Sequence, residues 1–147
     1  MRDSSGDSAL DLYAGVGLFA THLARAFRNV IAVESGGSAF RDLESNVQRA
    51  DLNVQAVRKT AEDFLAALER PPDLIVADPP RTGLGTIATR EFLRLRAPHL
   101  VFVSCDPATL ARDLNALLAG GYRIERLTLV DLFPQTYHLE TVVHLNL

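Results

Sequence analysis

The chain has 147 residues, a length typical of one domain, and 48% of its residues are hydrophobic. With 22% charged residues and no low-complexity tract, we expect a globular domain and not a disordered chain. The formal net charge of −3 argues against a domain that grips nucleic acid through its own positive charge. The single cysteine excludes an internal disulfide and a cysteine-rich metal site.

The sequence contains no run of 18 apolar residues, and its first eight residues are mostly polar. Neither a membrane span nor a signal peptide is therefore predicted, and we expect a cytoplasmic monomer with no membrane partner. We interpret residues 1–8 as a disordered leader or the edge of a longer chain, and residues 9–147 as one domain.

Short apolar runs alternate with helical patterns along the chain. The first strand is predicted at residues 9–13 and a helical pattern at 18–27. They are followed by strands at 30–33, 54–57, 74–77 and 100–103 and by helices near 38–51, 86–95 and 107–118. Thr60 is predicted to cap one more helix, with Asp63 three residues further on. Two last strands, near 122–131 and 138–146, have no helix between them.

This alternation predicts an α/β fold, a mostly parallel seven-stranded sheet with helices on both faces. The last two strands are expected to form an antiparallel pair at one edge. In such sheets, ligands bind outside the carboxyl ends of the strands. The polar motifs of this sequence fall at those ends.

The first strand runs into a glycine turn, from Asp11 to Gly17. Gly15 and Gly17 permit a tight turn that lets the backbone approach a ligand. Glu34 lies 19 residues after Gly15, at the end of the next strand, where a carboxylate can accept both hydroxyls of a ribose. The pattern indicates an adenosine-containing cofactor.

Two cofactors fit this spacing, and a plain structural turn is a third interpretation. A nicotinamide dinucleotide fits the loose Gly-x-Gly-x-x-Ala pattern, which directs a helix start at a pyrophosphate. Asp11, however, precedes the glycines by four residues, and an acid there suits a cofactor with a cationic amino-acid end. The sequence therefore favours S-adenosylmethionine.

Three further residues at strand ends are candidates for chemistry. Asp78 precedes two prolines that stiffen its loop, which is either a rigid surface turn or a functional loop. Cys105 comes between a strand and a helix start, which favours the reactive thiolate, so we predict a nucleophile in place of a buried structural thiol. Glu140 opens an apolar strand, and by itself it is equally well a solvated edge charge or a placed base.

Together these motifs resemble the RNA uridine-5 methyltransferases, which modify transfer or ribosomal RNA. The resemblance covers nearly the whole chain from Ala9. It rests on Asp11-Leu12-Tyr13-Ala14-Gly15-Val16-Gly17, Asp78-Pro79-Pro80-Arg81, the run from Ser104 to Asp113 and the run from Asp131 to Glu140.

The resemblance implies the Rossmann-like class I methyltransferase fold and S-adenosylmethionine as cofactor. It also implies that Cys105 is the nucleophile, that Glu140 is the base and that Asp78 holds the target base beside the cofactor. Tyr13 and Glu34 match positions that contact the cofactor. Family members usually carry RNA-binding domains upstream of this one, which agrees with the acidic charge of the chain.

The sequence departs from the family pattern at Leu18, where some members have a cofactor-binding asparagine. Thr60 lies near the usual place of an adenine-contacting acid, for which Glu62 or Asp63 can substitute. The alternatives are a non-catalytic cofactor- or RNA-binding fragment, an RNA cytosine-5 methyltransferase and an NAD-binding oxidoreductase. The cytosine-5 enzymes usually carry a cysteine in the loop after the fourth strand, where this chain has none.

Overall fold

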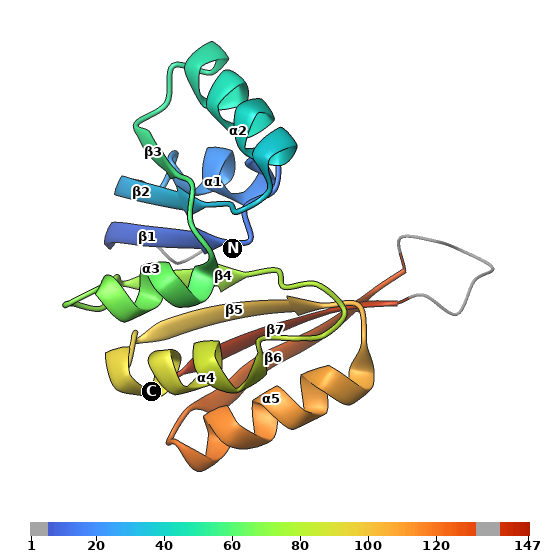
Figure 1. The fold of residues 1–147 in the computed structure, drawn as a ribbon. Coiled ribbons are helices and arrows are strands. Elements are labelled where there is room, and N and C mark those ends of the chain that lie inside the picture. The colour runs from blue at the N-terminus through green and yellow to red at the C-terminus, as the bar shows by residue number, and fades with distance from the viewer. Residues whose placement is uncertain (1–5, 132–138) are drawn as a thin grey trace.

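A seven-stranded sheet forms the centre of the structure, a computed structural model that describes residues 6–131 and 139–147. The strand order is β3-β2-β1-β4-β5-β7-β6 (Figure 1). The first five strands in the chain pair in parallel, whereas β7 is antiparallel to both of its neighbours. The strands are β1 (Gly6–Leu12), β2 (Phe27–Val33), β3 (Val54–Val57), β4 (Leu74–Ala77), β5 (His99–Ser104), β6 (Arg123–Val130) and β7 (Glu140–Asn146).

Within the described residues, five helices cover the two faces of this sheet. One core cluster packs α3, α4 and α5 on one face, and a second packs α1 and α2 on the opposite face, as Figure 1 shows. None of the helices in the described ranges is long and apolar enough to cross a membrane. The helices are α1 (Leu18–Leu23), α2 (Gly37–Arg49), α3 (Ala61–Ala67), α4 (Gly85–Leu95) and α5 (Pro107–Ala119).

Central strands β4 and β5 are buried on both faces, which explains why they read as continuous apolar runs. Leu74 and Val76 pack toward α1 and α2, whereas Ile75 and Ala77 pack toward α3, α4 and α5. The alternation follows the two-residue period of a strand. The predicted fold class, with helices on both faces and an antiparallel pair at the end, is confirmed.

The helix cap predicted at Thr60 is confirmed, and Asp106 caps a second helix. The Thr60 hydroxyl accepts a hydrogen bond from the backbone N–H of Asp63 at 3.1 Å, which begins α3. The Asp106 carboxylate accepts one from the N–H of Thr109 at 2.8 Å, and Pro107 occupies the first turn of α5. The second cap fixes the segment that carries Cys105.

The first strand begins at Gly6, so the predicted boundary at residue 9 is too late. Residues 6–8 pair with β2 in spite of their polar side chains. The Asp73 carboxylate, which lies just before β4, accepts hydrogen bonds from the backbone N–H groups of Asp7 at 2.8 Å and Ser8 at 2.9 Å. A partner 65 residues away therefore extends the strand where local hydrophobicity does not.

Candidate active site

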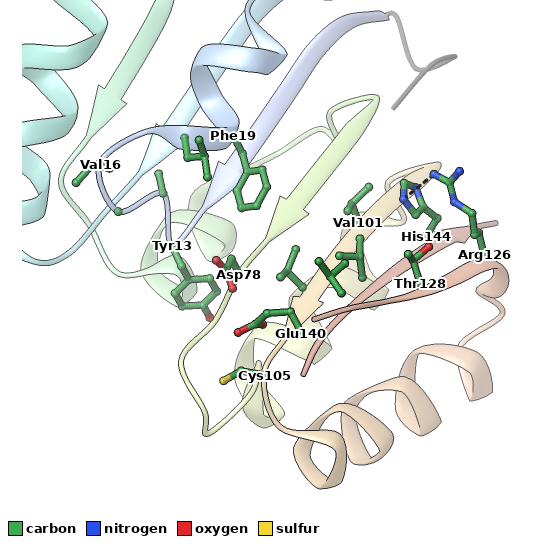
Figure 2. Close-up of a pocket in the computed structure, with 16 residues that line it drawn as sticks. Tyr13, Val16, Phe19, Asp78, Val101, Cys105, Arg126, Thr128, Glu140 and His144 are labelled. Atoms are coloured by element: carbon green, nitrogen blue, oxygen red, sulfur yellow. Dashed lines mark hydrogen bonds between the residues drawn. The ribbon is translucent and has the colours of Figure 1, made fainter. Parts of the chain in front are cut away.

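A groove of about 740 Å³ opens at the carboxyl ends of β1, β4 and β5 and runs along the uncovered part of the sheet over β5, β7 and β6. Figure 2 shows its side chains converging from these strands. Five of the predicted site residues line it, namely Tyr13, Gly15, Asp78, Cys105 and Glu140.

The pairing of β5 with β7 brings Cys105 and Glu140 together. Ser104 pairs with Thr141 at the end of this antiparallel ladder. Cys105 directly follows Ser104 and Glu140 directly precedes Thr141, so the two residues lie next to the last pair of this ladder. The thiol and the carboxylate therefore approach the groove from two neighbouring strand ends (Figure 2).

Asp78 follows β4 and completes this end of the groove (Figure 2). The residue as a whole is exposed, but its carboxyl group is partly desolvated by the groove walls. Desolvation, followed by the nearby negative charge of Glu140, raises the pKa of Asp78 to about 6. The site thus holds two interacting carboxylates beside one thiol.

The turn after β1 forms the side of the groove next to Asp78. Gly15 has a φ of 54°, and a Cβ built there would meet no described atom within 4 Å, so the turn leaves open space for a ligand. Tyr13 has a φ of 60°, an uncommon conformation for a residue with a side chain. Burial and the nearby Glu62 carboxylate raise the pKa of Tyr13 above its usual range.

Glu34 lies behind this turn and braces it. Its two carboxylate oxygens accept the backbone N–H groups of Gly15 at 2.9 Å and Gly36 at 2.6 Å. Each carboxylate oxygen can accept a second hydrogen bond, so the group keeps capacity for ribose hydroxyls. Gly17 precedes α1 and approaches Leu43 of α2, so it shapes the turn from the side away from the groove.

Asp11 is fully buried beneath the turn, so it acts on the site from below and not as part of the groove wall. Its Oδ2 accepts the N–H of Ala20 at 2.8 Å, while its Oδ1 has no hydrogen-bond partner in the described part of the chain. Burial is the largest cause that raises the pKa of Asp11 to about 7, and the charges of Asp78 and Glu34 add to it. A buried, incompletely paired carboxylate favours a positive charge above it.

Sequence reasoning missed the wall of the groove formed by β6 and β7. The Arg126 guanidinium donates a hydrogen bond to Nε2 of His144 at 3.0 Å, far along the groove from Cys105 (Figure 2). Burial and the Arg126 charge lower the pKa of His144. Strand residues at every second position carry no motif, so only the sheet topology assigns them to this wall.

Comparison with known proteins shows which family the chain belongs to. The family described as "tRNA (Uracil-5-)-methyltransferase" matches residues 1–147. The chain belongs to this family. The family predicted from the four motifs is therefore confirmed.

Several relatives of the family are similar over most of the chain. A protein from Thermotoga maritima named "Uncharacterized RNA methyltransferase" is 42% identical over 137 residues, which cover 92% of this chain and 31% of that protein. A Streptomyces coelicolor protein with a similar name is 43% identical and covers 96% of this chain. This chain thus spans about a third of the length of these relatives.

A solved structure of the family has the same fold. It is the tRNA (uracil-54, C5)-methyltransferase of Pyrococcus abyssi in complex with S-adenosyl-L-homocysteine. It superposes with a TM-score of 0.86 at 32% identity, covering 96% of this chain and 34% of that one. The Rossmann-like methyltransferase fold implied by the resemblance is confirmed.

Proposed function

We propose that this chain carries the site that transfers a methyl group from S-adenosylmethionine to carbon-5 of a uridine in tRNA or rRNA. The observation that carries the proposal is the convergence of Cys105, Glu140 and Asp78 in one groove, beside the Gly15 turn. Membership of the uracil-5 methyltransferase family supports it, as does the relative solved with S-adenosyl-L-homocysteine.

The chemistry of the donor set favours S-adenosylmethionine over a nicotinamide dinucleotide. A pyrophosphate needs free backbone N–H groups, but those of Gly15, Gly17 and Ala20 already donate to Glu34, to a backbone carbonyl and to Asp11. The carboxylates of Asp11, Glu34 and Asp78 also repel phosphate. Their negative charge suits the ammonium and sulfonium of S-adenosylmethionine. Tyr13, Gly15, Glu34 and Asp78 would contact this cofactor, whereas Asp11 and Gly17, which lie outside the groove wall, would support the turn that receives it. When bound, this cofactor supplies an electrophilic methyl group.

Cys105 performs the first step of the proposed reaction. Carbon-5 of uracil is a weak nucleophile, so the thiolate adds to carbon-6, forming a sulfur–carbon bond. The electrons of the carbon-5–carbon-6 double bond move toward the carbonyl oxygen at carbon-4, giving an enolate. Carbon-5 of this enolate is nucleophilic enough to accept the methyl group.

Glu140 performs the last step. Its carboxylate removes the proton that remains on carbon-5, the ring double bond forms again, and the bond between sulfur and carbon-6 breaks. The thiolate returns to Cys105 and the proton rests on Glu140. The position of Glu140 in the same groove as Cys105 suits this role, because both residues must reach adjacent carbons of one ring.

Asp78 orients the uracil ring in this proposal. An ionised carboxylate at the end of β4 can accept the N3–H of uracil while the ring lies between Cys105 and the cofactor. The uridine must leave its base stack to enter a groove of this kind. Since the chain carries a net charge of −3, we propose that other parts of a longer polypeptide hold the RNA.

The direct test uses S-adenosylmethionine and RNA that contains 5-fluorouridine. Fluorine cannot leave carbon-5 as a cation, so the final elimination is blocked and the protein–RNA bond should survive denaturation. Wild-type protein should give a shifted band on a denaturing gel, and Cys105→Ala should give none. An adduct that persists in Cys105→Ala would refute the assignment of the nucleophile.

A second pair of variants tests the base with ordinary uridine. Glu140→Gln should accumulate the methylated adduct, because addition proceeds but elimination stalls. Glu125→Gln is the matched control, since it makes the same change on the exposed strand β6 of the same hairpin. Equal adduct levels in the two variants would contradict the role of Glu140.

The non-catalytic alternative is addressed by repeating the 5-fluorouridine test with the longer polypeptide. An adduct from the longer protein alone would assign catalysis to this site and RNA holding to other domains. Absence of an adduct from both would leave a cofactor-binding fragment. Calorimetry with S-adenosylhomocysteine and with NAD distinguishes a methyltransferase from an oxidoreductase. Binding of NAD alone would favour the oxidoreductase.

A further inference from the structure

Two loops meet on helix α5, and three of its side chains hold them together. The loop over residues 78–84 carries Asp78, and α5 follows directly after Cys105 and Asp106. The Thr109 hydroxyl donates to the backbone carbonyl of Arg81 at 3.1 Å, and the same hydroxyl lies 3.1 Å from the Asp106 carboxylate that caps α5. The first turn of α5 thus contacts both loops.

The next turn of α5 binds the Asp78 loop more strongly. The Arg112 guanidinium donates to the carbonyl of Thr82 at 2.8 Å. The Asp113 carboxylate is 3% exposed and accepts the N–H of Leu84 at 2.7 Å through one oxygen. Its other oxygen accepts two hydrogen bonds from Arg112, at 2.9 and 2.8 Å.

Gly83 allows this close approach. It lies between the two anchored residues, with a φ of 76°, and a Cβ built there would collide with the side chains of Asp113 and Arg112. The loop also closes on itself, since the N–H of Gly83 donates to the carbonyl of Pro80 at 2.8 Å. Charge-assisted hydrogen bonds therefore bind both sides of the glycine.

We propose that Arg112 and Asp113 are positioning residues that lock the Asp78 loop onto the helix behind Cys105 and so fix the carboxylate relative to the thiol. The inference deepens the proposed function and rests on it for its catalytic consequence. The lock itself is a property of the fold and can be tested separately. Neither side chain lines the groove in the described part of the chain, so neither is a catalytic residue.

The chain provides a matched control for this pair. On α4, Arg94 pairs with the buried carboxylate of Glu91 at 2.6 Å and donates to the carbonyls of Leu65 at 2.8 Å and Leu68 at 3.1 Å. It thus anchors a helix to a neighbouring segment with the same chemistry as Arg112, but away from the Asp78 loop. Arg94→Gln should cost similar stability without moving Asp78.

Limited trypsin cleavage of the folded protein measures how readily the loop over residues 78–84 opens. The bond after Arg81 lies inside the locked loop, and mass spectrometry identifies a fragment that ends there. Arg112→Gln should increase the initial cleavage rate at this bond about tenfold, because cleavage follows local opening. Arg112→Lys, which keeps the charge and a donor, should be intermediate, and Arg94→Gln should match the wild type. Equal cleavage at Arg81 in Arg112→Gln and wild type would overturn the inference.

The catalytic consequence is read from the rate of adduct formation with 5-fluorouridine RNA at saturating RNA. Arg112→Gln should lower this rate by on the order of 10- to 100-fold, because a displacement near 1 Å in an active site has that effect. Arg94→Gln should leave it unchanged. Faster cleavage with an unchanged adduct rate would refute the link to Asp78. If neither the wild-type chain nor the longer polypeptide forms an adduct, the proposed function fails, and cleavage after Arg81 still decides whether these contacts hold the loop.

Discussion

The buried carboxylate of Asp11 makes the free energy of unfolding depend on pH, and Asp11→Asn should remove this contribution. Asp11→Asn keeps the shape of the side chain, and its amide oxygen can still accept the N–H of Ala20. The pKa of Asp11 is raised from 3.8 to about 7 in the folded protein, mainly by burial. Between these two values the folded state binds more protons than the unfolded state. The free energy of unfolding contributed by this group therefore falls as pH rises.

The size of the effect follows from the same shift. A displacement of the pKa from 3.8 to about 7 corresponds to about 4 kcal/mol in total, and solvent screening is small because the side chain is 0% exposed. Between pH 4.5 and 8.5, linkage gives a loss of about 3 kcal/mol for the wild type that the variant does not share. Asp11→Asn should therefore become more stable relative to the wild type by that amount as pH rises.

Urea unfolding followed by far-UV circular dichroism measures this difference at several pH values. The midpoint of the variant should move away from that of the wild type by roughly 1–3 M urea over this range, given slopes typical of small domains. Other titrating groups, including Asp78, are present in both proteins and largely cancel. A constant difference between the two proteins from pH 4.5 to 8.5 would refute the raised pKa of Asp11.

Three further predictions follow from the site and the core. The rate of adduct formation should rise with pH through about 6 as Asp78 ionises, and Asp78→Asn should remove this pH-dependent rise. A rise that persists in the variant would come from another group. Gly15→Ala should lower the free energy of unfolding by about 1–2 kcal/mol, because residue 15 has a φ of 54°. The substitution should also weaken the binding of S-adenosylhomocysteine measured by calorimetry, and unchanged affinity would mean that the ligand does not approach this turn. Phe92→Ala removes a ring that is 2% exposed and should destabilise the fold by about 3–5 kcal/mol in urea unfolding; a loss below about 1 kcal/mol would show that the core collapses around it.

Local sequence was sufficient for most elements because their signals are short-range. The strands at 54–57 and 74–77 begin and end where the apolar runs do, and Thr60 caps a helix as its spacing predicts. Part of the candidate site could also be predicted from the sequence. Motifs that follow parallel strands meet at one edge of the sheet, so Asp78 and Cys105 could be assigned to one site from chain order alone.

Other features depended on partners distant in the chain. Residues 6–8 extend β1 by pairing with β2, and Asp73 binds the backbone N–H groups of Asp7 and Ser8. The pairing of β5 with β7 brings Glu140 beside Cys105 in the groove, and a shift of this register by one residue would turn the Glu140 side chain to the other face of the sheet. Residues 132–138, part of the last motif, lie outside the described residues.

The fold class, the family and the residue types at the strand ends could be predicted from the chain alone, because hydrophobic period and motif spacing are local features. The three-dimensional structure was needed to show that Asp11 is buried with a raised pKa, that Arg126 and His144 line the groove, and that Arg112 and Asp113 bind the Asp78 loop. The burial of a side chain, the electric field of nearby charges and the register of two strands all arise from packing between segments far apart in the chain. No local pattern encodes them, and they set the chemistry of the site.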